Sequence, residues 1–301
     1  MSERARSSRR DFLTMTSAAA AAAPFLSFAA LPRQMAVQEV IDIIVAAIPG
    51  APLEETVDTI KIGDPAMHVT GIATTFLATS DVIKRASDRG ANLIITHEPT
   101  FFNHLDETDW LAGDGVYRSK RQLAEERGVA IWRFHDYLHL VEPDGILNGM
   151  LRRLGWEDAP VSAGDRTDLP SICDIEPMTL LALAEHFKER LGIPHPLRAV
   201  GDPSMRCRRV ALLLGAYGGR RQMNFLMDAD VDVLVIGEVP EWETNIYVSD
   251  ARSAGIHLAL LELGHAYSEE PGMEYLVEWL QPKVEGIPVM HVPTGDVFVR
   301  M

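Results

Sequence analysis

The fold is decided by the stretch ANLIITHEPTFF, which runs from Ala91 to Phe102. Its short apolar run, Leu93–Ile95, is typical of a strand that is buried on both faces, as in a parallel sheet. The strand must end before Pro99, because proline has no N–H to donate to a sheet ladder. His97 and Glu98 therefore lie at the carboxyl end of a central strand, where open α/β sheets bind ligands. The two side chains are either a pair of metal ligands or a polar strand end that faces water.

The residues before this strand predict a βαβ unit. Val69–Phe76 is expected as a strand and Thr79–Arg89 as a helix, with Thr79 or Ser80 as the N-cap. The helix leads into the Leu93–Thr96 strand. The two strands should therefore be parallel, and their crossover should be right-handed.

The next predicted strand also ends in candidate metal ligands. Val129–Phe134 is mostly apolar and is followed by His135, Asp136 and His139. Because the carboxyl ends of parallel strands meet at one edge of a sheet, we expect these residues at the same edge as His97.

Strands and helices also alternate in the second half of the chain. We expect strands at Arg209–Gly215, Val231–Ile236 and His257–Leu263, separated by helices at Gln222–Asp228 and Glu241–Ala254. This pattern predicts an α/β fold of two interlinked lobes with mainly parallel sheets. Further helices are predicted at Gln38–Ile48, Val116–Glu126, Gly145–Leu154, Leu180–Leu191 and Pro271–Leu280, and a last strand at Pro288–Pro293.

The N-terminus has the features of an export signal. The paired arginines Arg9 and Arg10 precede an apolar, alanine-rich stretch from Met15 to Ala30, and Ser27–Ala29 offers small residues for cleavage. This arrangement resembles a twin-arginine translocation signal, which implies export to the periplasm or the outside and no stable membrane span after removal. The alternative, a disordered basic N-terminus, does not explain the apolar stretch.

These observations divide the sequence into four parts. Residues 1–35 are the predicted signal, 36–160 an N-terminal α/β lobe, 161–205 a connecting segment rich in Gly and Pro, and 206–301 a C-terminal lobe that completes the site.

The composition excludes some functions. The 301 residues include 43 acidic and 28 basic residues, and this net charge of -15 argues against nucleic-acid binding. The two cysteines, Cys173 and Cys207, cannot form a thiolate zinc cluster, and they form either one disulfide or two packed thiols.

A second pair of candidate ligands lies near the C-terminus, in GHAYSEE. His265 follows a predicted strand, and Glu269 lies four residues later, with Ser268 expected to cap the next helix. Imidazole and carboxylate ligands suit Zn, Mn, Fe, Co or Ni. Together with His97, Glu98 and His139, the pair predicts a metal site.

These motifs resemble those of the NIF-three-like family, also named GTP cyclohydrolase I type 2. In IITHEP, His97 matches the first His of the family's His-His-Pro motif, and Glu98 stands in place of the second. In FHDYLH, His135 matches the family's His, and His139 takes the place of a ligand Asp. The final motif is intact as His265 and Glu269, and the preceding Gly-Glu pair as Gly237-Glu238, so the resemblance covers Gln38 to Phe298.

The resemblance implies a NIF-three-like fold, two divalent metal ions per chain and a ring-shaped homohexamer. The exchanges at Glu98 and His139 keep the number of ligands, so we expect the dinuclear site to persist with an altered metal preference. The implied activity is cyclohydrolase-like hydrolysis of a small molecule of unknown identity by a metal-activated water, with Glu238 as a general base or as a carboxylate that supports a ligand. The alternative is a non-catalytic, metal-binding scaffold.

Overall fold

The stretch Leu93–Thr96 forms β3, the central strand of a five-stranded sheet. The computed structural model describes residues 34–162, 171–299 and 301. In this first sheet the strand order is β1-β4-β3-β2-β11, with β4, β3, β2 and β11 parallel and β1 antiparallel at the edge. The other strands are β1 (Ile60–Ile62), β2 (Ile72–Thr75), β4 (Ala130–Arg133) and β11 (Val289–His291).

The second sheet has six strands in the order β5-β6-β8-β9-β10-β7. Its three central strands are parallel, and the strands outside them pair antiparallel. The strands are β5 (Val161–Ser162), β6 (Ser171–Thr179), β7 (Arg198–Val200), β8 (Arg206–Leu213), β9 (Val233–Ile236) and β10 (Ala259–Glu262).

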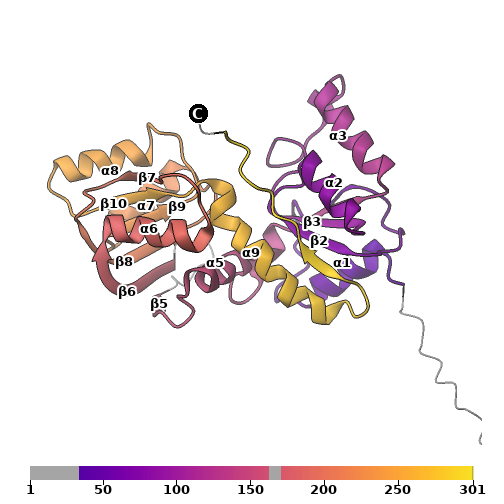
Figure 1. The fold of residues 1–301 in the computed structure, drawn as a ribbon, viewed down its shortest axis with the longest axis horizontal. Coiled ribbons are helices and arrows are strands. Elements are labelled where there is room, and N and C mark those ends of the chain that lie inside the picture. The colour runs from indigo at the N-terminus through magenta and orange to yellow at the C-terminus, as the bar shows by residue number, and fades with distance from the viewer. Residues whose placement is uncertain (1–33, 163–170, 300) are drawn as a thin grey trace, which may run out of the picture. The chain divides into compact units, whose positions relative to one another are not determined.

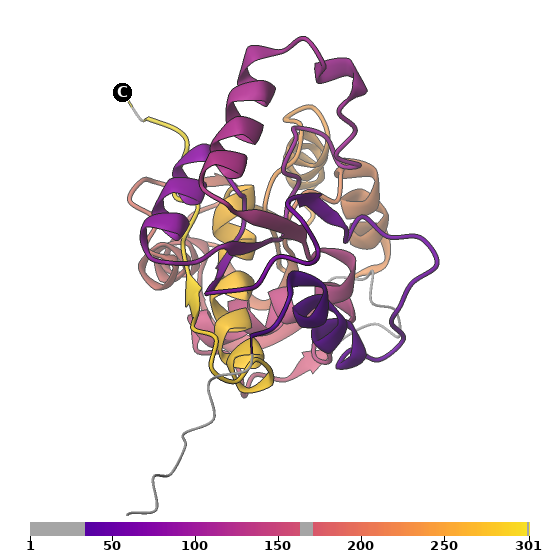
Figure 2. The same cartoon turned by 90° about the vertical axis from the view of Figure 1, so that its right-hand side faces the viewer.

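The predicted βαβ unit is present as β2, α2 and β3. The Thr79 hydroxyl accepts a hydrogen bond from the Val82 N–H at 3.1 Å and so caps α2. Helices cover both sheets (Figures 1 and 2). They are α1 (Val37–Ala46), α2 (Ser80–Asp88), α3 (Gly115–Glu126), α4 (Asp136–Leu140), α5 (Gly145–Leu154), α6 (Leu180–Leu191), α7 (Gly219–Asp228), α8 (Thr244–Ser253) and α9 (His265–Leu280), with 3₁₀ turns at Asp109–Leu111 and Gln281–Lys283.

Helices α5 and α9 join the two sheets. They lie between the sheets in Figure 1 and cross at glycines, where an added Cβ at Gly149 would collide with the backbone of Pro271 and Gly272. One buried apolar cluster contains Leu93 and Trp132 of the first sheet together with residues of the second. The α/β fold with interlinked lobes is therefore confirmed, and Gln34–Met301 form one compact unit.

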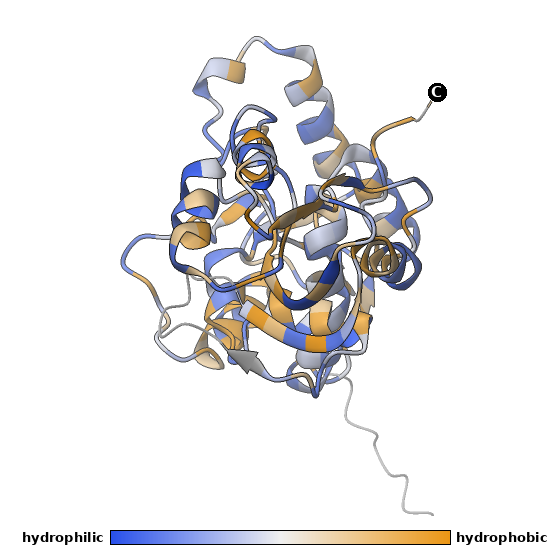
Figure 3. Ribbon diagram, turned by 90° about the vertical axis from the view of Figure 1, so that its left-hand side faces the viewer, coloured by the Kyte–Doolittle hydropathy of each residue, from blue (hydrophilic) through white to orange (hydrophobic). Residues whose placement is uncertain are grey.

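Hydropathy follows this layering. Figure 3 shows hydrophobic residues on the strands, while the outer helices carry both hydrophobic and hydrophilic residues. The four residues of β3 are all buried, as are those of β2 and β4. The continuous apolar run of β3 is thus the signature of a strand that is covered on both faces.

Three sequence-based expectations differ from the structure. Helix α9 begins at His265 rather than at Pro271, so Ser268 lies inside the helix and Gly264 occupies the N-cap position. The Ser268 hydroxyl instead donates to the His265 carbonyl at 2.7 Å and accepts from the Gly215 N–H at 2.9 Å. The range 161–205, expected as a connecting segment, contains β5, β6 and β7 of the second sheet. The range 206–301, expected as the C-terminal lobe, includes β11, which belongs to the first sheet.

The remaining expectations concern the N-terminus and the cysteines. Arg9, Arg10 and the apolar stretch lie outside the described residues. In the part of the chain that is described, no helix combines the length and apolarity needed to cross a membrane. Cys173 and Cys207 are buried free thiols, which settles the open alternative in favour of unpaired cysteines.

Candidate metal centre

The strand ends of the first sheet bring three histidines together. His97 follows β3, His135 follows β4, and α4 carries His139. The ring of His97 stacks on that of His135 with 4.6 Å between centroids, and both rings meet the edge of His139 at 5.2 Å. Each histidine offers a ring nitrogen within 4.8 Å of the others, a spacing that can hold a metal ion.

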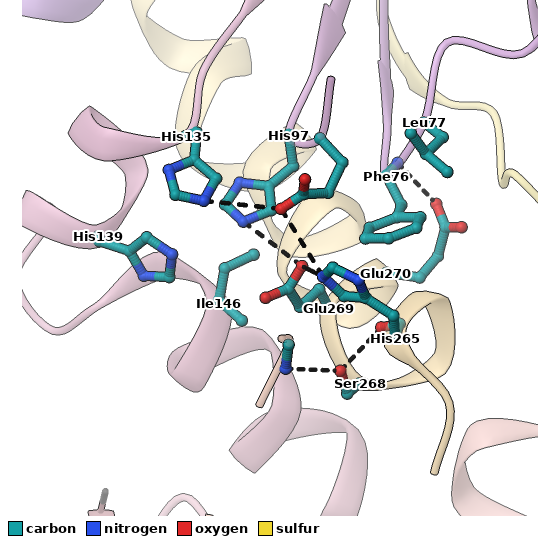
Figure 4. A network of polar contacts seen from close by, with 12 residues as sticks. Phe76, Leu77, His97, His135, His139, Ile146, His265, Ser268, Glu269 and Glu270 are labelled. Carbon is teal, nitrogen blue, oxygen red and sulfur yellow. Dashed lines mark hydrogen bonds and ion pairs between the residues drawn. The ribbon is translucent and has the colours of Figure 1, made fainter. Parts of the chain in front are cut away.

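The start of α9 brings the second half of the chain to the same place. His265 and Glu269 lie one turn apart, and the Glu269 Oε2 atom is 3.0 Å from the His265 Nε2 atom and 3.6 Å from that of His97. The Glu98 Oε1 atom lies 3.6 Å from His135 Nε2 and 3.7 Å from His265 Nε2. Glu269 therefore lies between His265 and His97 (Figure 4), and Glu98 lies within 4 Å of both His135 and His265.

All four imidazoles are held in the same way. In each ring the Nδ1 atom lies within hydrogen-bond distance of an oxygen, which leaves the Nε2 atom toward the shared centre. An Nδ1–H donor to oxygen fixes the ring and keeps Nε2 as the metal-binding atom, as is usual for metal ligands. The oxygens are Phe134 O for His97 (3.2 Å), Asp136 Oδ1 for His135 (2.9 Å), Asp144 Oδ2 for His139 (2.7 Å) and Glu238 Oε1 for His265 (3.1 Å).

The buried nitrogen of His97 gives a direct test of whether a metal fits. The His97 side chain is fully buried, and its Nε2 atom has no hydrogen-bond partner among the described residues. A buried polar atom without a partner is costly, and native structures rarely tolerate one. A cation that is bound to Nε2 would satisfy the lone pair, so this donor set fits a metal ion.

The electrostatics of the cluster lead to the same conclusion. Burial lowers the pKa of His97 well below its usual value, and nearby His135 and His139 lower it further, so His97 is held neutral. Burial also raises the pKa of Glu98, and the adjacent Glu269 raises it further. Two buried carboxylates side by side favour either a proton or a cation between them.

Nearby carboxylates raise the pKa values of two further histidines, His139 and His265. Burial lowers the pKa of His139, but Asp144, Glu269 and Glu98 outweigh it and raise that pKa to about 9. In the same way Glu238, Glu269 and Glu98 raise the pKa of His265 to about 10 against the effect of burial. The carboxylates of the site thus favour positive charge. Without a metal, protons on His139 and His265 supply it.

A buried arginine supports the ligand loop. The Arg133 Nε atom donates to the His97 carbonyl at 3.1 Å, and its guanidinium lies 3.6 Å from Glu98 and 3.7 Å from Asp106. Lys61 in turn pairs with Asp106 at 3.3 Å. These contacts fix the backbone that follows β3 and orient Glu98.

The structure brings six of the seven sequence-predicted site residues to one centre and places Glu238 behind His265. The sequence analysis missed Asp144, Arg133 and Asp58. Asp58 accepts hydrogen bonds from the N–H groups of His135, Asp136 and Tyr137, which shapes the turn into α4. Asp144 had a readable signal, because an Asp directly before a helix is a typical N-cap. The residues that the structure gathers are His97, Glu98, His135, His139, His265 and Glu269.

Comparison with known proteins identifies the family of the chain and agrees with the fold. The family model Duf34/NIF3 (NGG1p interacting factor 3) matches residues 35–295. The chain belongs to this family. Two proteins named GTP cyclohydrolase 1 type 2 homolog are similar to the NIF3-family chain. The Clostridium acetobutylicum protein is 25% identical over 76% of this chain and 84% of its own length, and the Clostridium perfringens protein is 24% identical over 83% and 93%.

A solved structure supports the NIF3 fold independently. The Bacillus cereus protein related to NIF3 superposes with a TM-score of 0.71 at 17% identity, and the match covers 89% of this chain and 100% of that protein. At this level of identity the likeness establishes the fold alone.

Proposed function

We propose that this NIF3-family protein binds two divalent metal ions per chain and acts as a metal-dependent hydrolase. The observation that carries the proposal is the set of four imidazoles, each fixed through Nδ1, whose Nε2 atoms surround Glu98 and Glu269. Such a donor set selects Zn, Mn, Fe, Co or Ni over Mg or Ca, which prefer oxygen ligands alone.

The ligands divide into two groups. His97 has one nitrogen left for a metal, and His135 and His139 complete a nitrogen-rich position around it. His265 lies on the opposite side of the carboxylates and would hold the second ion. Glu98 and Glu269 each approach histidines of both groups, so they are placed to be shared between the two positions.

The protein's own residues determine what chemistry is possible. When bound, two such ions supply Lewis acidity and lower the pKa of water enough to make a nucleophile at neutral pH. Glu238 accepts the Nδ1–H of His265 at 3.1 Å, and this hydrogen bond lowers the pKa of its carboxyl group. Glu238 therefore remains an anion that positions His265, and its partly exposed carboxylate can also accept a proton from a reacting group.

The metal content tests the first half of the proposal. Elemental analysis of protein purified without added chelator should find about two ions per chain, and His265→Ala should reduce this to about one. Fewer than one ion per chain in the unmodified protein would refute the dinuclear site.

The activity is tested by a screen of the metal-loaded protein against amides, phosphoesters and cyclic C–N bonds, including GTP. We expect turnover that His265→Ala abolishes. Metal binding without turnover on any of these classes would instead support a non-catalytic scaffold.

We further propose that the protein assembles as a homohexamer. Family membership supports this, and so does the number of large apolar side chains on the surface, such as Trp110 and Trp242, which are 65% and 77% exposed. Light scattering coupled to gel filtration should give six times the mass of one chain, and a monomeric mass would refute it.

The N-terminal motif supports a proposal about location. We propose that the twin-arginine sequence directs export of the folded protein to the periplasm or the outside. Replacement of Arg9 and Arg10 by lysine should retain the protein in the cytoplasmic fraction. An unchanged distribution would contradict this route.

A further inference from the structure

A pocket of about 610 Å³ opens beside the metal centre. It shares Glu98, Glu238 and His265 with the centre, so a molecule in the pocket would reach the ligands directly. The volume is in the usual range for small-molecule sites. Its apolar lining comes from Phe76, Leu77, Leu263, Tyr267, Val297 and Phe298.

Among the described residues that line this pocket, four carboxylates outnumber Arg198 and the imidazoles of His195 and His265, and His195 lies 3.6 Å from Asp296. Besides Glu98 and Glu238, the carboxylates of Glu262 and Asp296 line it. Arg198 is the one lysine or arginine among the described residues that line the pocket. Its guanidinium already contacts Glu241 at 2.7 Å and Glu262 at 3.4 Å.

Glu262 has acceptor capacity that the described residues do not use. Its side chain is only 9% exposed, and its Oε1 atom has the long contact with Arg198. Its Oε2 atom is buried and has no hydrogen-bond partner in residues 34–162, 171–299 and 301. A carboxylate can accept about four hydrogen bonds, so the Glu262 carboxylate, whose residue lines the pocket, is under-satisfied.

From this geometry we propose that the pocket binds an amine-bearing molecule with an apolar body, whose protonated amino group donates to the Glu262 carboxylate. The inference rests on the proposed function, because the hydrolysable group of such a substrate would lie against the metal centre at Glu98 and His265. The apolar wall takes the body of the molecule, and its positive charge offsets the excess of carboxylates.

The same charges disfavour a nucleoside triphosphate. Phosphate recognition relies on arginine, lysine or free backbone N–H groups. Among the described lining residues the one arginine is paired with two glutamates, and a triphosphate at the N-terminus of α9 would face Glu238 and Glu262.

Three probes that share a phenyl group and differ in charge test the proposal. They are 2-phenylethylamine, 2-phenylethanol and 3-phenylpropionate, titrated by NMR into the full chain after the metals are removed with EDTA, so that no probe can ligate a metal. The amine should bind about tenfold more tightly than the alcohol, as expected for a hydrogen bond to a charged group, and 3-phenylpropionate should bind most weakly.

Two variants locate the effect. Glu262→Gln should lower the affinity for the amine to that for the alcohol, whereas Glu285→Gln, at an exposed position that does not line the pocket, should change neither. If Glu262→Gln does not fold, the ranking of the three probes on the unmodified protein decides the question alone.

The outcomes separate this inference from the proposed function. Equal binding of the amine and the carboxylate, tighter binding of GTP than of the amine, or an unchanged preference in Glu262→Gln would each overturn it. None of these measurements requires turnover. A protein that hydrolyses a substrate but shows no preference for the amine would refute the pocket assignment alone.

Discussion

At the scale of single residues, Asp144 links a helix to the candidate metal centre. One of its carboxylate oxygens accepts from the Ile146 and Leu147 N–H groups and caps α5, while the other accepts from His139 Nδ1. The two roles use different atoms of the same side chain, so a substitution can separate them.

Asp144→Asn should weaken metal binding while α5 stays capped. Asparagine is as good an N-cap as aspartate, but its NH₂ group cannot accept the Nδ1–H of His139. Loss of such a supporting hydrogen bond typically reduces metal affinity about 10–100-fold. Competition with a chromogenic chelator would measure the affinity.

The control is Asp114→Asn, at the N-cap of α3, where the side chain accepts from the Tyr117 N–H. It should leave the metal affinity unchanged. Equal affinities for Asp144→Asn and the unmodified protein would show that the His139 contact does not support a ligand.

A second residue, Lys120, makes stability depend on pH. Burial lowers its pKa from 10.5 to about 8, even though Asp106 acts in the opposite direction, and its amine donates to the Thr100 carbonyl at 2.5 Å. Between pH 8 and 10.5 the unfolded chain therefore holds more protons at this residue than the folded chain. The free energy of unfolding should rise with pH in this window, by on the order of 2–3 kcal/mol.

Urea unfolding at several pH values, compared between the unmodified protein and Lys120→Met, would isolate this contribution. The difference in unfolding free energy between the two proteins should vary across the window. For Lys84→Met, at an exposed lysine, it should not vary. A constant difference for Lys120→Met would mean that the amine is not destabilised by burial.

At the scale of elements, the strands that the sequence predicts best are those with continuous apolar runs. The buried strands β3, β4 and β9 have this pattern because both faces are covered. The edge strands β1 and β7 were not predicted, because a strand of three residues is too short to show a periodicity in sequence.

The residues of the candidate site also differ in how far the sequence predicts them. The candidate ligands at strand ends, and His265 and Glu269 in GHAYSEE, could be predicted from the sequence. The local sequence determines where a strand ends and which residues are spaced i, i+4. The oxygens that contact the histidine Nδ1 atoms, and the role of the buried Arg133, could not be predicted, because they depend on the three-dimensional arrangement of the chain. Gly264 as the start of α9 was missed because Pro271 reads as a helix start, although here it lies within the helix.

Helix packing also sets the position of His265 and Glu269. Gly149 on α5 lies against the backbone of Pro271 and Gly272 on α9, only a few residues beyond these ligands. Gly149→Ala should push the two helices apart and cost about 1–3 kcal/mol of unfolding free energy, with a lower metal content.

Denaturant unfolding and elemental analysis would measure both effects. Gly115→Ala is the matched control, because it also lies in a helix but an added Cβ there meets nothing within 4 Å. A Gly149→Ala protein as stable as this control would show that α5 and α9 can separate without strain.

At the scale of the whole molecule, the site joins parts of the chain that precede and follow the second sheet. His97, Glu98, His135 and His139 come from the first sheet and α4, whereas Glu269 lies on α9, after β10. A metal that binds both sets binds only the folded arrangement, since the unfolded chain does not hold these residues together. Binding of a metal at this site would therefore stabilise the described unit as a whole.

Metal removal should consequently lower the melting temperature. With free metal at about 100 times its Kd, binding adds about 2.7 kcal/mol, which corresponds to a shift of about 5–10 °C for a unit of this size. Calorimetry before and after EDTA treatment would measure the shift. His97→Ala should melt lower than the unmodified protein and should respond less to EDTA, because it lacks the ligand that both candidate metal-binding groups share. Identical melting with saturating metal and with EDTA would mean that the converging imidazoles hold no ion in the folded protein.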